Sequence, residues 1–154
     1  MMKLKYIFPI MAASLFCFPA AAKPSLNDIQ GCQAVLDFVD ARVGTVSKYD
    51  EKDVKIIQSA LRDYNKFLQD EHIAPGLLAF TGGDENKAKA FQTQIDAYKL
   101  TIVQGLKQRH PQPRIFTDQA VSINGCYSKA PMSADKTPVM KEALETMVKL
   151  AKQG

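Results

Sequence analysis

The sequence predicts an all-α protein: an antiparallel bundle of four main helices plus one short helix, pinned by one disulfide. Apolar residues recur with helical period in four stretches, and no stretch shows the sustained alternation typical of half-buried strands. Two of the three cysteines, Cys32 and Cys126, lie far apart in sequence outside the first 22 residues and can join two of the expected helices.

Residues 1–22 have the pattern of a cleaved secretory signal peptide. Lys3 and Lys5 precede the apolar run Tyr6–Phe18, and the small residues Ala20–Ala22 follow it. The apolar run is shorter than the roughly 20 residues that a membrane-spanning helix requires. We therefore expect cleavage after Ala22, a periplasmic or secreted protein without membrane insertion, and a single helical-bundle domain over residues 23–154.

The first two helices each begin at a capping arrangement. Ser25 with Asp28 opens the first, and Gly44 should end it; Asp50 with Asp53 opens the second, which should stop before Pro75. Each carries an apolar stripe at spacings of three and four, first Ile29, Cys32, Leu36, Val39, Val43 and Val46, then Val54, Ile57, Leu61, Tyr64 and Leu68.

The third and last helices are marked in the same way. Asp84 caps the third, which the segment His110–Pro113 ends, and Thr137 followed by Pro138 opens the last. Their predicted stripes are Ala88, Phe91, Ile95, Tyr98, Ile102 and Leu106, then Met140, Leu144, Met147 and Ala151.

The fifth, short helix is expected within Arg114–Pro131. Its apolar residues are Ile115, Phe116, Ala120, Val121 and Ile123, after which Asn124-Gly125 should turn the chain into Cys126.

Cys32 and Cys126 are expected to form a structural disulfide. Cys17 belongs to the apolar leader and leaves with it, so an even number of cysteines reaches an oxidising compartment. A redox-active pair is the alternative, but the chain has no C-x-x-C motif.

The charge distribution allows two interpretations. The signal peptide removes Lys3 and Lys5, which leaves a net charge of +2 and gives no support for nucleic-acid binding. Residues 23–85 carry a net −4 and residues 86–154 a net +6. Acidic and basic halves can attract each other within one bundle; alternatively, Lys107, Arg109 and Arg114 form a basic surface for an acidic partner.

The segment Ile73–Phe80 is apolar where a connecting loop would normally be polar. Such a segment either folds over the open end of the bundle or exposes a hydrophobic contact site. In the second case, Leu77, Leu78 and Phe80 are the expected partner surface.

No cofactor is expected. The chain lacks C-x-x-C-H, and His72 and His110 have no ligand-spaced partners, so each is interpreted as a residue at a helix end. A bundle can still hold haem or a small apolar ligand between its helices.

One local motif resembles a known enzyme family. The run Phe91–Lys99 reads F-x-x-Q-I-x-A-x-K and is similar to a helix of the secreted, all-helical chorismate mutases. The resemblance implies a Claisen rearrangement in a pocket whose cationic and amide side chains, here Lys99 and Gln94, hold a dicarboxylate. The family's upstream arginine and lysine pattern is not reproduced around Arg42 and Arg62.

The leading hypothesis is an exported protein-binding module without catalytic activity, such as an inhibitor, an immunity protein or a chaperone-like factor of the bacterial periplasm. The alternatives are a chorismate mutase-like enzyme and a carrier of haem or a small apolar ligand.

Overall fold

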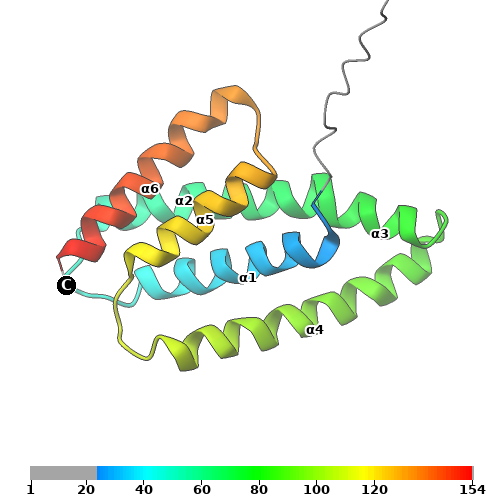
Figure 1. Ribbon diagram of the computed structural model, residues 1–154, viewed down its shortest axis with the longest axis horizontal. Coiled ribbons are helices and arrows are strands. Elements are labelled where there is room, and N and C mark those ends of the chain that lie inside the picture. Colours follow the sequence, from blue (N-terminus) through cyan, green and yellow to red (C-terminus); the bar gives the residue numbers. More distant parts are fainter. Residues whose placement is uncertain (1–23, 154) are drawn as a thin grey trace, which may run out of the picture.

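The computed structural model describes residues 24–153, and this part of the chain is helical without a strand (Figure 1). The all-α bundle is confirmed. The predicted signal peptide lies outside the described residues. The helices are α1 (Leu26–Val43), α2 (Glu51–Leu68), a π-helical turn (Gln69–Ile73), α3 (Ala74–Phe80), α4 (Glu85–Arg109), α5 (Thr117–Lys129), a 3₁₀ turn (Ala134–Lys136) and α6 (Thr137–Lys152).

Helix α1 lies at the centre of the fold. It packs against α2, α4 and α5, while α6 covers α2 and α5 (Figure 1). The predicted stripe of α1 is buried from Ile29 to Val43, and Phe38 and Ala34 join it. No helix between residues 24 and 153 is both long enough and apolar enough to cross a membrane.

The start of α1 is fixed by the predicted capping box. The Asp28 N–H donates to Ser25 Oγ over 3.1 Å, and the Ser25 N–H donates to the Asp28 carboxylate over 3.3 Å. The Ser25 hydroxyl also donates to the Asp28 carboxylate over 2.7 Å. This bond above all, together with the one from the Ser25 N–H, holds the pKa of Asp28 below its ordinary value.

The predicted disulfide is confirmed. Cys32 on α1 and Cys126 on α5 are bonded, with an S–S distance of 2.06 Å and 5.7 Å between their Cα atoms. Nearby, the buried Tyr64 hydroxyl donates to the Ala130 carbonyl over 3.1 Å at the end of α5. Burial raises the pKa of Tyr64 well above its ordinary value. The disulfide therefore links α5 to α1, and the Tyr64 hydrogen bond links the end of α5 to α2.

The prediction that the second helix stops before Pro75 is wrong. The chain stays helical from Glu51 to Phe80 because a π-helical turn precedes the proline. In this turn the Ala74 N–H donates to the Gln69 carbonyl, five residues back. The wider turn accommodates Pro75, which has no N–H to donate, so the helix continues instead of breaking.

The predicted turn at Asn124-Gly125 is also wrong, because α5 runs through both residues to Lys129. Gly125 costs about 1 kcal/mol in a helix relative to alanine. Burial of Ile123 and the covalent bond at Cys126 hold the backbone on either side and offset that cost.

The predicted stripe of α4 is only partly correct. Ile95, Ile102 and Leu106 pack against the core, but Phe91 and Tyr98 are 36% and 55% exposed. Helix α4 contacts only α1 and α3 closely, so it has fewer apolar neighbours than α1 or α2. Two aromatic residues expected in the core therefore lie on the surface.

Candidate partner-binding surfaces

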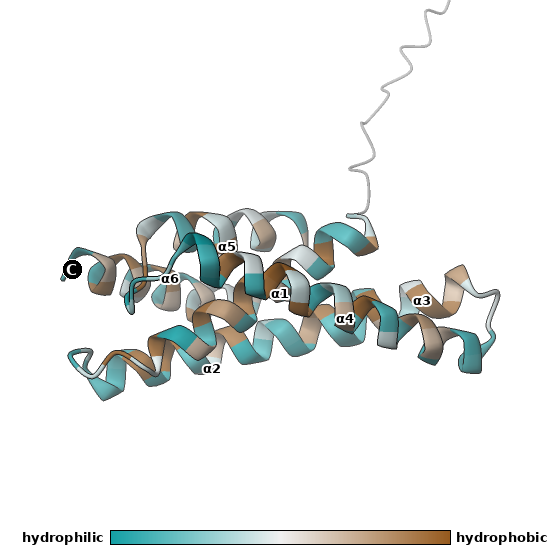
Figure 2. Cartoon of the chain, turned by 90° about the horizontal axis from the view of Figure 1, so that it is seen from below, coloured by the Kyte–Doolittle hydropathy of each residue, from teal (hydrophilic) through white to brown (hydrophobic). Residues whose placement is uncertain are grey.

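Helix α3 and the first turns of α4 form a hairpin that projects from the bundle. Figures 1 and 2 show both extending past the start of α1, and apolar residues lie on the projecting α3. The turn at its end uses Gly82 and Gly83, whose φ angles of 65° and 88° favour glycine. The Thr81 hydroxyl adds a hydrogen bond to the Leu77 carbonyl over 3.0 Å.

Three exposed aromatic residues lie on this hairpin and the adjoining part of α4; we call Phe80, Phe91 and Tyr98 the aromatic patch. Phe80 is 70% exposed. Its ring meets the Phe91 ring edge-to-face, with 5.2 Å between centroids. Tyr98 is two helical turns after Phe91 and therefore on the same side of α4. Exposed aromatic side chains in such a group are characteristic of protein contact sites.

The structure separates the three residues predicted as a partner surface in Ile73–Phe80. Leu77 is buried, Leu78 is 38% exposed and Phe80 is the most exposed. Leu78 and Phe80 are about 160° apart around the helix, so they lie on different sides. The inner side is tightly packed, since a Cβ atom at Gly76 would come within 2.6 Å of the Leu26 side chain. The segment Ile73–Phe80 therefore packs against the bundle through Leu77 and also exposes the apolar side chain of Phe80.

Polar side chains add to the apolar contacts that hold α4 on the bundle. Gln30 is buried and its side-chain amide donates to the Ile95 carbonyl. Lys99 Nζ lies 3.0 Å from the carboxylate of Asp37, which also accepts from the Asn65 amide over 2.5 Å. These directional contacts lie beside the apolar contacts of Ile95, while Phe91 and Tyr98 stay exposed.

A relay of glutamines continues this polar docking. Gln33, buried on α1, reaches Gln69 over 3.4 Å, and the Gln69 amide donates to Gln92 on α4 over 2.9 Å. The apolar stripes in the sequence did not indicate this relay. The signal that could have revealed it is the run of amide residues on helices that otherwise look apolar or charged.

The predicted basic surface is only partly assembled. Lys107 and Arg114 line two adjoining hollows, of about 450 Å³ and 500 Å³, where the end of α4 meets the end of α1. Arg42 also lines the first hollow and Lys48 the second. Arg109 lines neither, and its guanidinium instead donates to the Gly105 carbonyl one turn back. The charge of residues 86–154 alone could not predict that Arg42 of α1 joins this basic surface.

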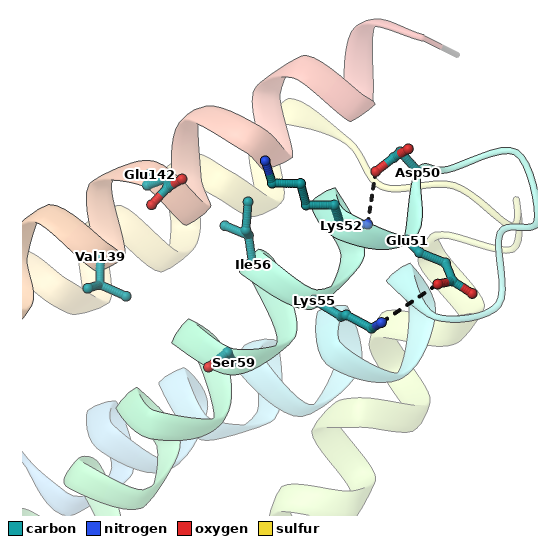
Figure 3. A pocket seen from close by; sticks show the side chains of 8 residues that line it. All are labelled: Asp50, Glu51, Lys52, Lys55, Ile56, Ser59, Val139 and Glu142. Atoms are coloured by element: carbon teal, nitrogen blue, oxygen red, sulfur yellow. Dashed lines mark hydrogen bonds and ion pairs between the residues drawn. The ribbon is translucent and has the colours of Figure 1, made fainter.

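Another hollow, of about 690 Å³, lies between the start of α2 and α6 and is lined by residues of both charge signs (Figure 3). Asp50 accepts from the Lys52 N–H as the cap of α2, and Glu51 lies 3.6 Å from Lys55. Most of the charged residues of this hollow thus interact within the chain, and none of them was predicted as a site residue from the sequence.

Gln94 and Lys99, the residues implied by the resemblance to chorismate mutases, are not brought together. Gln94 is exposed, and five residues of helix place it about 140° around α4 from Lys99. The Lys99 ammonium is already paired with Asp37. Arg62 is paired with Asp40 on α1 at 3.0 Å.

The two histidines lie apart, each beside aromatic rings. His110 lies between Phe38 and Phe116, with ring centroids 6.0 Å and 5.5 Å away, and His72 lies 5.4 Å from Phe67. Among residues 24–153 no group of three or more histidine, cysteine, aspartate or glutamate side chains could hold a metal ion.

No protein-family model matches the chain, and comparison with curated proteins and with solved structures gave no significant match.

Proposed function

We propose that this chain is an exported, non-catalytic protein-binding module that contacts its partner through the aromatic patch. The observation that carries the proposal is the projecting α3–α4 hairpin with Phe80, 70% exposed, at its end. Burial of that ring on a partner removes apolar surface from water, which is the main driving force of protein association.

The surroundings of the patch support this reading. Lys87 and Gln94 lie four residues before and three residues after Phe91, so both share its side of α4. A central group of aromatic side chains with a polar rim is the usual anatomy of a protein interface. The Phe80–Phe91 contact also limits the freedom of both rings, which reduces the entropy lost on binding.

Export is the second part of the proposal. It rests on the leader pattern in residues 1–22 and on the disulfide, which is typical of proteins in oxidising compartments. The partner is then another periplasmic or secreted protein, as expected for an inhibitor, an immunity protein or a chaperone-like factor.

Affinity capture from a periplasmic extract tests the proposal. The wild-type chain should retain a stoichiometric protein partner, and Phe80→Ser should weaken that complex about tenfold or more, because aromatic anchors dominate interface energies. Leu100→Ser is the matched control, since Leu100 is 60% exposed on the opposite side of α4 from Phe91.

If both variants lost the partner equally, general surface hydrophobicity would explain the binding. That result would contradict a specific role of the aromatic patch. Capture of no protein, or of a chromophore in its place, would contradict the binding-module function itself.

A further inference from the structure

The two hollows lined by Lys107 and Arg114 adjoin each other and share the wall residues Thr45 and Pro113. We name them together the basic double hollow. Lys107 is 16 residues after Phe91, or about 24 Å along α4, so the double hollow is well separated from the aromatic patch. Binding at the double hollow is therefore independent of binding at the aromatic patch.

Neither half of the double hollow is lined by an aspartate or a glutamate. The three other hollows characterised in residues 24–153 all include carboxylates, for example Glu142, Glu145 and Asp70. No carboxylate in this range lies within 4.0 Å of Arg42, Lys107 or Arg114. These three cations are therefore available to an external anion.

The ends of α1 and α4 reduce this positive charge without cancelling it. Each helix C-terminus carries about half of a negative elementary charge, so two of them offset about one cation. Three available cations less that one leave a surplus of about two positive charges, enough to balance two carboxylates.

Both arginines are held in place before any ligand arrives. The Arg42 guanidinium stacks 4.8 Å from the centre of the Phe38 ring and donates to the Gln112 carbonyl. The Arg114 guanidinium lies 4.4 Å from the centre of the Phe116 ring. A guanidinium stacked on a ring keeps its edge N–H groups directed outward, where they fit a carboxylate.

The loop that carries Arg114 is also fixed. Pro111 and Pro113 restrict its backbone, and the buried Ile115 N–H donates to the Tyr49 hydroxyl over 3.1 Å. A site that is already ordered loses little entropy when it binds. The same prolines, with Val46, give the double hollow apolar walls that a bare inorganic anion could not use.

We propose that the basic double hollow binds an acidic peptide segment of a protein, with one carboxylate side chain in each half. Each of the two adjoining hollows has a cation of its own, so each can take one carboxylate side chain of an extended peptide. The apolar walls between and around the cations favour a peptide over a small phosphate-bearing ion.

Fluorescence anisotropy with a labelled peptide of alternating glutamate and alanine tests the proposal. The wild-type protein should bind it, and Lys107→Gln/Arg114→Gln should weaken binding about tenfold, since it removes one cation from each half. The matched control is Lys89→Gln/Arg109→Gln, which removes the same charge from α4 outside the double hollow and should change the dissociation constant less than about twofold.

Equal weakening by the two double variants would overturn the proposal, because a general field and not a site would then attract the peptide. Failure of the peptide to bind would also overturn it. Inorganic pyrophosphate and phosphatidylcholine–phosphatidylglycerol vesicles serve as parallel probes. If either bound in a manner sensitive to Lys107 and Arg114 while the peptide did not, the occupant would be a phosphate group or a membrane instead.

Discussion

Replacing both disulfide cysteines, as Cys32→Ala/Cys126→Ala, is expected to lower the free energy of unfolding by about 3–5 kcal/mol. The bond joins residues 94 positions apart, so it removes a large amount of chain entropy from the unfolded state. Small domains are stable by only about 5–15 kcal/mol in total, which makes this a large fraction.

Urea denaturation followed by circular dichroism measures this effect. Wild-type protein under reducing conditions is the natural control, because it should unfold close to the double variant. A difference of less than about 1 kcal/mol between oxidised and reduced protein would show that helix packing alone holds α5 in place.

Leu77→Asp is expected to destabilise the fold by about 4 kcal/mol, whereas the same change at the neighbouring Leu78 should cost about 1 kcal/mol or less. Leu77 is 3% exposed and belongs to the main hydrophobic core, so an aspartate there is a buried charge without a partner. Leu78 is 38% exposed, so an aspartate at that position reaches water.

Urea midpoints of the two single variants provide the comparison. Equal midpoints would mean that α3 does not pack on the bundle as described. The distinction also guides functional work, because loss of binding in Leu77→Asp would report unfolding, while loss in Phe80→Ser would report a missing contact.

The regular apolar helices could be predicted from sequence because their burial follows periodicity. The stripes of α1 and α2, with caps at Ser25 and Asp50, need no tertiary information, and the pairing of Cys32 with Cys126 follows from the number of cysteines. The all-α class was predictable for the same reason.

Features that depend on packing against other elements could not be predicted. The π-helical turn before Pro75 and the continuation of α5 through Gly125 both oppose the local preference of the sequence. Periodicity likewise placed Phe91 and Tyr98 in the core, whereas α4 packs closely only on α1 and α3 and has too few apolar neighbours to bury both rings.

The candidate surfaces were likewise predictable in part: single residues could be predicted from the sequence, but their grouping in the fold could not. Sequence identified Phe80, Lys107 and Arg114 as surface candidates by composition. It could not assign Arg42 to the basic double hollow, because the end of α1 meets the end of α4 only in the folded chain.

Site-specific photo-crosslinking in intact cells tests the central claim, partner binding through the aromatic patch, most directly. A photoreactive phenylalanine analogue at position 80 should give one discrete protein adduct, and the same analogue at position 100 should give none. Adducts of equal yield at both positions, or no adduct at position 80, would contradict the claim.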